Sequence, residues 1–497
     1  MRGSILWITL GLGLIGVLGF AFLRMQPEPV EEVETVEEVE APLEGIWPDR
    51  GVPWTGDLTG MLERGEIRVL TSYSLGGYFI DRGKQKGLVY ETIQHLETFA
   101  KKTLGQPARN LRFVIIPVRR DQLLPLLIDG HGDMVAANLR ITPGRLETVD
   151  FATPFTNADQ ESLILGPASP PISRIDDLAG HEVVVREDAS YFETLTGLNA
   201  RFVEEGKAPI EISRADPRLA TEDLMQMVDA GLLPMTVADG FHTTLWTQVL
   251  ENLATDEALV LHEGGEIAHA LRQNSPELKE LLSAFAETFQ VGKEVPNILL
   301  KRYTEAGDWV AHALERDPFR KLDETKALFQ KYGEEYGFDW LMLACFALQE
   351  SGFDQKARNP SGAVGIMQVL PSTAADKSVN VKNIETLEGN IHAGSKYLSV
   401  LRSTYFDDPG LDPFEQMLFT MAGYNAGPNR INRLRKEAAK KGLDPNRWFG
   451  NVELVVGAKV GREPVKYVGN IYKYYIAYFR TLDQLEDRAK VEEPVLD

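Results

Sequence analysis

A single glutamate, Glu350, follows an apolar run over 341–348 and precedes Ser351 and Gly352. A run that is apolar on every side predicts a buried helix, so we expect Glu350 at the C-terminal end of that helix. Partial burial and the negative end of the helix dipole both raise the pKa of a carboxyl group. A carboxylic acid protonated near neutral pH can be a general acid in glycosidic cleavage. The alternative is a helix that surfaces and ends, with Glu350 in solvent and Gly352 as its terminating glycine.

Three further segments with polar and aromatic side chains follow Glu350-Ser351 along the chain. They are Gly365-Ile366-Met367-Gln368, Tyr424-Asn425-Ala426-Gly427, and Glu463 with Tyr467-Val468. This order on a helical background resembles the soluble-lytic-transglycosylase domain, whose helical fold is similar to that of goose lysozyme. The resemblance covers Leu322 to Leu482 and implies a site that acts on the glycan strands of peptidoglycan. One departure is Gly423, which stands where the family usually has alanine before Tyr-Asn.

The resemblance implies that Glu350 is the catalytic residue. It would protonate the oxygen of the β-1,4 bond between N-acetylmuramic acid and N-acetylglucosamine. It would then accept the proton of the muramic 6-hydroxyl, whose attack yields a 1,6-anhydro end. Ordinary glycosidases use two carboxylates, whereas this family needs one because the nucleophile belongs to the sugar. The resemblance implies substrate-binding roles for Ser351, Met367, Gln368, Tyr424, Asn425, Glu463 and Tyr467.

Three of these residues have an ordinary structural alternative when they are considered without the resemblance. Ser351 could be a hydroxyl at the end of a helix, and Met367 could be a core side chain. Tyr467 could be a buried aromatic near the start of a helix.

The elements that must hold these residues are helices. From about Asp323 onward the pattern predicts helices without strands, separated by segments that contain Gly and Pro. The predicted helices span 322–336, 340–349, 386–405, 414–424 and 465–481. We therefore expect an all-α, lysozyme-like domain over 318–497.

An α/β domain is predicted ahead of the helical one, over 61–305. From about Gly65 to Gly292 short apolar strands alternate with helices, which indicates an α/β fold with largely parallel sheets. Segments such as Ile141-Thr142-Pro143-Gly144-Arg145 and Ala238-Asp239-Gly240 resemble the periplasmic solute-binding proteins for amino acids. The resemblance implies a two-lobed domain that closes on its ligand.

Three residues of this domain are implied in ligand binding by that resemblance. Arg145 would clamp a ligand α-carboxylate with its bidentate guanidinium, and Asp239 would take the ammonium. Tyr73 would stack on the ligand, with Tyr78 as the alternative. For Arg145 the alternative is a surface ion pair with Asp150 or Glu147.

The N-terminus contains an apolar stretch of about 19 residues, Ile5 to Leu23, which is long enough to span a bilayer. Arg2 precedes it and favours a cytoplasmic N-terminus. The stretch offers no good cleavage site, so 1–25 is predicted to be a membrane anchor, with a removed signal as the alternative. The Glu-rich tract that follows predicts a solvated spacer over 26–60. We expect a location in the bacterial cell envelope, on the periplasmic face, either anchored in the inner membrane or peripheral to the outer membrane.

The net charge and the cysteine and histidine content bear on possible partners, disulfides and metal sites. The chain has 497 residues and a formal net charge of −21, which argues against binding to nucleic acid. Cys345 is the single cysteine, so no intrachain disulfide can form. His262, His269 and His392 do not have metal-ligand spacing. We expect neither a metal nor a cofactor.

The two domains behind a membrane anchor resemble the membrane-bound lytic murein transglycosylases. The expected partners are peptidoglycan strands, the membrane, and a muropeptide or amino acid that binds the first domain and alters access to the glycan groove. Such regulation requires two states with different ligand affinity. Two alternatives are a lysozyme-like hydrolase, in which water replaces the 6-hydroxyl, and a solute sensor whose helical domain only binds peptidoglycan. The presence of Glu350, Gln368 and Asn425 argues against the sensor.

Overall fold

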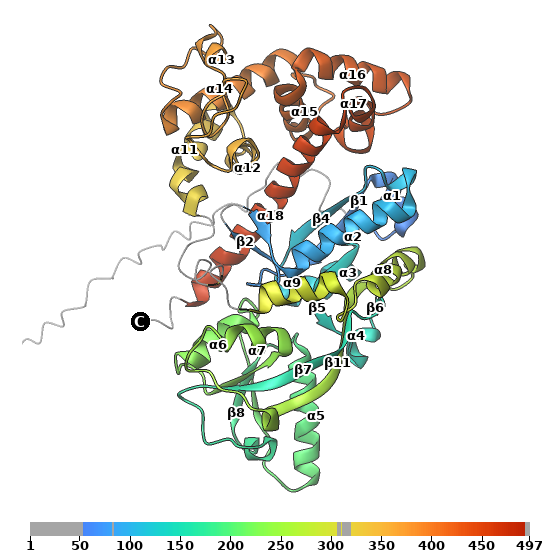
Figure 1. The fold of residues 1–497 in the computed structure, drawn as a ribbon, viewed down its shortest axis with the longest axis vertical. Helices are drawn as coiled ribbons and strands as arrows, with labels where there is room; N and C mark the ends of the chain where they lie inside the picture. Colours follow the sequence, from blue (N-terminus) through green and yellow to red (C-terminus); the bar gives the residue numbers. More distant parts are fainter. Residues whose placement is uncertain (1–52, 82–83, 306–309, 311–319, 493–497) are drawn as a thin grey trace, which may run out of the picture. The chain divides into compact units, whose positions relative to one another are not determined.

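The computed structural model describes residues 53–81, 84–305, 310 and 320–492 (Figure 1). The predicted anchor over 1–25 and most of the predicted spacer over 26–60 lie outside the described residues. Within the described ranges, no helix combines the length and apolar character needed to cross a membrane. The first described helix, α1 (Leu58–Arg64), begins before the end of the predicted spacer.

The first domain is built on a mixed sheet with the strand order β10-β7-β11-β5-β1-β4. The strands of this sheet are β1 (Glu66–Thr71), β4 (Arg112–Pro117), β5 (Met134–Arg140), β7 (Thr156–Leu165), β10 (Met235–Asp239) and β11 (Val260–Arg272), with β6 (Val149–Phe151) paired to β11. Two small sheets are formed by β2 (Phe79–Asp81) with β3 (Lys84–Lys86) and by β8 (Glu182–Val185) with β9 (Glu211–Arg214).

The prediction of largely parallel sheets is only partly right. Strand β1 pairs in parallel with β4 and β5, and β8 pairs in parallel with β9. Strand β11 runs antiparallel to β5, β6 and β7, and β10 runs antiparallel to β7. The long strands β7 and β11 pair directly with each other, which a simple alternation of strands and helices along the chain does not reveal.

Helices cover the sheet, and each lobe contains a hydrophobic core. The helices are α2 (Leu88–Leu104), α3 (Leu123–Ile128), α4 (Pro143–Leu146), α5 (Ser190–Glu204), α6 (Thr221–Asp229), α7 (Gly240–Trp246), α8 (Pro276–Thr288) and α9 (Glu294–Thr304). Ile67 and Val69 of β1 pack with residues of α2 and α8 in the first core. The second core contains Val183 of β8 and Leu195 of α5. The observed architecture agrees with the predicted two-lobed α/β fold.

A buried carboxylate, Asp133, ties the first lobe together. Its side chain has no solvent exposure. Arg64 Nη2 lies 2.5 Å from Asp133 Oδ2, Arg68 Nη2 lies 2.8 Å from Oδ1, and the Arg68 backbone N–H donates to Oδ2 at 2.7 Å. Arg272 Nη2 lies 3.5 Å from Oδ1. The single carboxylate of Asp133 is therefore the counter-charge for three guanidinium groups, one each from α1, β1 and β11.

Among its described residues, the second domain has helices as its regular elements and contains none of the named strands, as predicted. Its α-helices are α11 (Arg320–Tyr336), α12 (Trp340–Ser351), α13 (Pro371–Ala375), α14 (Leu387–Tyr405), α15 (Pro413–Ala426), α16 (Pro428–Lys440), α17 (Glu453–Lys459) and α18 (Arg462–Glu492) (Figure 1). Five of them, α11, α12, α14, α15 and α18, lie where the sequence predicts helices. The shorter helices α13, α16 and α17 were not predicted.

Helix α12 forms the centre of this domain for reasons that are visible in its sequence. Asp339 caps its N-terminus by accepting from the backbone N–H of Leu341, and the residues 341–348 are all buried. Gly352 ends the helix in the left-handed conformation, at φ 64°, which glycine adopts without steric cost. Glu350 therefore lies in the last turn, where the buried helix meets a half-buried surface.

Candidate active site

Glu350 is half-buried at the end of α12, and its carboxyl group has an altered acidity. Burial, with a smaller contribution from the negative charge of Glu463, raises the pKa of Glu350 to about 7 despite the hydrogen bond that it accepts from Tyr467. A carboxyl group with this pKa is protonated in a large fraction of molecules at neutral pH, which suits a general acid. The predicted rise in its pKa agrees with this environment.

Tyr467, Glu463 and Asn425 approach Glu350 from two other helices. Tyr467 lies in α18, is 5% exposed, and donates its hydroxyl to Glu350 Oε1. Glu463, one turn earlier in α18, accepts a hydrogen bond of 3.1 Å from Asn425 Nδ2 at the end of α15. Asn425 Oδ1 is buried and has no hydrogen-bond partner among the described residues. The group therefore contains two carboxyl groups, those of Glu350 and Glu463, one hydroxyl donor, and one amide oxygen without a partner among the described residues.

The loop after α12 is held by hydrogen bonds from several site residues. Ser351 Oγ donates to the Ile366 carbonyl at 2.7 Å, and Tyr424 Oη donates to the Met367 carbonyl at 2.9 Å. Gln368 has a positive φ of 48°, and its side-chain amide donates to the Gly365 carbonyl at 2.8 Å. These three side chains therefore brace the loop in this structure, in addition to any contact with a sugar.

Met367 is fully buried, in agreement with the alternative that it is a core side chain. Its backbone N–H donates to Asn390 Oδ1 at 2.9 Å. A side chain at Gly394 would meet the Met367 sulfur at 2.6 Å, so the close packing of α14 here depends on that glycine. Sequence reasoning missed Asn390, which is 0% exposed and also donates to the carbonyls of Val364 and Ile384. A polar residue on the buried face of the predicted helix 386–405 was the available signal.

Two substitutions beside Glu350 are expected to move the pH dependence of activity in opposite directions. Tyr467→Phe removes a donor that favours the ionised carboxylate, so the pKa of Glu350 should rise and the alkaline limb of kcat/KM should move to higher pH. Glu463→Gln removes a repelling charge, so the same limb should move to lower pH. Initial rates of glycan cleavage from pH 4 to 9, in roughly half-unit steps, measure both shifts. Shifts of the same sign would contradict this electrostatic account.

In the α/β domain, the structure brings two of the three predicted ligand residues together. Arg145 and Asp239 line one cavity of about 10 Å³. Arg145 is buried and donates to the backbone carbonyls of Arg140 at 2.7 Å and Asp188 at 2.8 Å, rather than to Asp150 or Glu147. Asp239 accepts from Tyr191 Oη at 2.9 Å and from the backbone N–H of His242 at 3.0 Å.

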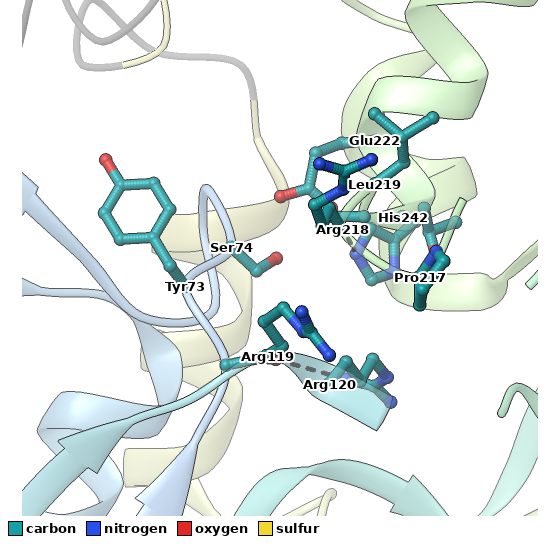
Figure 2. A pocket seen from close by; sticks show the side chains of 12 residues that line it. Tyr73, Ser74, Arg119, Arg120, Pro217, Arg218, Leu219, Glu222 and His242 are labelled. Carbon is teal, nitrogen blue, oxygen red and sulfur yellow. Dashed lines mark hydrogen bonds and ion pairs between the residues drawn. The ribbon is translucent and has the colours of Figure 1, made fainter. Parts of the chain in front are cut away.

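Tyr73 lies in a neighbouring cavity of about 30 Å³, which Arg120 also lines. Figure 2 shows Tyr73, Ser74, Arg119 and Arg120 on one side and Arg218, Glu222 and His242 on the other. Tyr78, the alternative to Tyr73, is 0% exposed and donates to Gln85. Each of the two cavities holds no more than about one or two water molecules, so an amino acid would need the lobes to separate.

Comparisons with known proteins match two segments of this chain to family models. Residues 67–304 match the family model of bacterial extracellular solute-binding proteins, family 3, and residues 327–446 match the transglycosylase SLT domain. Two relatives are called membrane-bound lytic murein transglycosylase F. The one from Desulfosudis oleivorans is 29% identical over 86% of this chain and 94% of its own length. The one from Shewanella pealeana is 28% identical over 84% of this chain and 86% of its own length.

The α/β domain is also similar to a solved structure, an ancestral arginine-binding protein bound to arginine. That structure is 20% identical, has a TM-score of 0.40, and covers 48% of this chain and 99% of its own. Of the predicted active-site residues, Glu350, Ser351, Met367, Gln368, Tyr424 and Asn425 lie inside the residues matched to the SLT domain. Glu463 and Tyr467 lie beyond them, in α18.

Proposed function

Since this chain is a membrane-bound lytic murein transglycosylase F-like protein, with a family 3 solute-binding domain ahead of an SLT domain, we propose that it cleaves peptidoglycan by lytic transglycosylation. Glu350 is the proposed acid and base. The observation that carries this role is a half-buried carboxyl group with a pKa raised to about 7, hydrogen-bonded to Tyr467 and flanked by Glu463.

The proposed reaction uses the one carboxyl group twice. Protonated Glu350 gives its proton to the glycosidic oxygen as the bond to the muramic anomeric carbon breaks. The resulting carboxylate then accepts the proton of the muramic 6-hydroxyl as that oxygen bonds to the same carbon. Glu350 ends in its starting protonation state, and no water is consumed. A pKa near the working pH suits both steps, because neither protonation state is strongly disfavoured.

The neighbouring residues support these steps in different ways. The Tyr467 hydroxyl stabilises the carboxylate formed after the first proton transfer. The buried Asn425 Oδ1 lacks a partner and is a suitable acceptor for an N–H or O–H of the sugar. Glu463 is exposed and accepts from Asn425, so its proposed role is to contact glycan and orient that amide rather than to act as a second catalytic carboxylate.

Mass spectrometry of digested peptidoglycan tests the reaction. The full chain and its Glu350→Gln and Glu334→Gln variants are compared on purified sacculi, Glu334 being an exposed glutamate of the same domain. We expect 1,6-anhydromuropeptides from the wild type and from Glu334→Gln but not from Glu350→Gln. Reducing-end products, heavier by one water, would indicate a lysozyme-like hydrolase instead. Retained peptidoglycan binding without products from any variant would favour a solute sensor.

For the α/β domain we propose an effector role, with an amino acid or a muropeptide as the ligand. The support is that Arg145 and Asp239 share one cavity and that the domain belongs to the family 3 solute-binding proteins. The proposed location is the cell envelope, on the periplasmic side and membrane-associated, which suits both a peptidoglycan substrate and a periplasmic effector. The inner membrane is the finer proposal, because the apolar stretch from Ile5 to Leu23 is long enough to span it.

A further inference from the structure

Helix α16 is strongly basic, although the whole chain has a formal net charge of −21. Residues 428–441 contain six Lys and Arg residues and one acidic residue. Arg430, Arg433, Lys436 and Lys440 are exposed and follow one another at spacings of three, three and four residues. Residues at these spacings are neighbours on the surface of a helix, so the four form one row along α16.

Two more exposed basic residues, Arg462 and Lys466, lie in the first turns of α18. They are sequence neighbours of Glu463 and Tyr467, two residues of the candidate active site. The row on α16 begins near the same site, because α16 starts shortly after Asn425. We refer to these six exposed basic residues of α16 and α18 as the cationic face: Arg430, Arg433, Lys436, Lys440, Arg462 and Lys466.

Helix α17 connects the two parts of the cationic face. It lies beside α16 in the helical domain (Figure 1). Lys459, the last residue of α17, places its Nζ 3.4 Å from Glu437 Oε1 of α16, and α18 begins a short distance further along the chain. The two groups of basic residues therefore belong to one continuous part of the surface.

The basic residues of the cationic face differ from their neighbours in having no carboxylate partner among the described residues. Nearby, Lys441 and Lys459 share Glu437 at 3.8 and 3.4 Å, and the buried Arg435 pairs with Asp408 at 3.0 Å. Like charges three or four residues apart destabilise a helix slightly. The row is therefore better explained by a partner that supplies negative charge than by the folding of α16 itself.

The anionic groups of a peptidoglycan strand are on its peptide stems. The sugars are N-acetylated and uncharged, and the lactyl group of muramic acid is joined to the stem as an amide. The stems carry free carboxylates, which guanidinium and ammonium groups bind through charge-assisted hydrogen bonds. From Arg430 to Lys440 the row extends about 15 Å along α16, so it reaches beyond the single sugar whose bond is cleaved.

We propose that the cationic face binds the carboxylates of the peptide stems on a glycan strand whose scissile bond lies at Glu350. This inference rests on the proposed function, because it takes the strand bound at Glu350 as given. It adds a basis for substrate choice: strands with free stem carboxylates bind more tightly than strands whose stems are uncharged. The attraction is between exposed charges, so it weakens as salt is added.

Strand binding by the full chain in detergent tests the proposal. All proteins carry Glu350→Gln, so that the strands stay intact during the measurement. Fluorescently labelled strands with intact stems are compared, by anisotropy, with the same strands after carbodiimide coupling to ammonia, which turns the stem carboxylates into neutral amides. The triple variant Arg433→Gln, Lys436→Gln, Lys440→Gln is matched by a control with the same loss of charge. That control replaces three exposed basic residues of the α/β domain by glutamine: Lys102, Arg109 and Lys293.

We expect the parent and the control to bind the carboxylate strands about 3- to 10-fold more tightly than the amidated strands. This preference should disappear between about 0.1 M and 1 M salt, as the Debye length falls from about 10 Å to about 3 Å. The triple variant should lose the preference and bind both strands as the parent binds the amidated ones. Equal affinity of the parent for both strands would overturn the proposal. A preference retained in the triple variant would also overturn it, because the stems would then be recognised elsewhere, such as in the α/β domain. Binding is measured without a reaction, so a failure to form anhydro products would refute the proposed function separately.

Discussion

Replacing Glu350 by glutamine is expected to lower the rate of glycan cleavage by about 10²- to 10⁴-fold, the usual contribution of general acid–base catalysis. Glutamine has nearly the same shape but can neither donate a proton to the glycosidic oxygen nor accept one from the 6-hydroxyl. Its amide can still accept from the Tyr467 hydroxyl, so the arrangement of side chains around position 350 should be kept. Single-turnover rates on defined glycan strands, together with strand binding, measure the change. A loss of binding equal to the loss of rate would contradict a chemical role.

The same variant is expected to be more stable than the wild type above neutral pH. The folded-state pKa of Glu350 is about 7, above the ordinary value of 4.5, so between these values the folded protein holds more protons than the unfolded chain. Stability therefore falls as pH rises through this window. Glutamine carries no such charge, so the difference in Tm between the two proteins should be small at pH 4 and larger at about pH 8. A Tm difference that does not change with pH would contradict this linkage.

The second large effect is expected at Asp133, where Asp133→Asn should lower the free energy of unfolding of the α/β domain by about 3–5 kcal/mol. Asparagine keeps the size of the side chain but leaves the buried guanidinium of Arg68 without its counter-charge, beside Arg64 and Arg272. Urea unfolding followed by circular dichroism measures this loss.

Asp150→Asn provides the matched control for this prediction. Asp150 lies in the same domain and pairs with Lys279 at 3.4 Å, with both side chains more than a third exposed. A surface pair of this kind contributes about 0–1 kcal/mol, so little change is expected. Similar unfolding curves for the two variants would mean that the buried network contributes no more than a surface pair.

Most long helices of the catalytic domain could be predicted because their buried faces are strongly apolar. Helix α12 is buried along 341–348, and its sequence has no other reasonable interpretation. Helix α16 was missed because it is rich in charged and amide side chains and begins with proline. Its buried positions Ile431, Leu434 and Ala438 do follow helical spacing, but they are few and one buried position between them is Arg435.

The sheet was harder to predict than the helices, because pairing is not a local property. The sequence indicates strands at 67–70 and 111–117, and both exist as β1 and β4. The residues of β11 do not indicate that it lies antiparallel to β5 and β7. This direction depends on the path by which the chain returns to the first lobe after the second.

The proposed acid was easier to predict than the contacts around it. Glu350 after an apolar run is a weak signal by itself, and its predicted role depends on the other motifs that follow it in order along the chain. The contacts of Ser351 and Gln368 with the loop carbonyls depend on the path of the backbone, including a positive φ at Gln368. Arg145 likewise donates to the backbone carbonyl of Asp188, which lies 43 residues away along the chain.

The three hydrogen bonds of Asn390 bear on the thermodynamics of glycan capture. Asn390 fixes Val364, Met367 and Ile384 from inside α14, and a side chain at Gly365 would collide with its amide at 2.2 Å. The loop after α12 is thus held by hydrogen bonds in the free protein, and a glycan strand that bound beside it would remove little chain entropy from this loop. Association should consequently be limited by encounter and by stiffening of the sugar chain rather than by ordering of the enzyme.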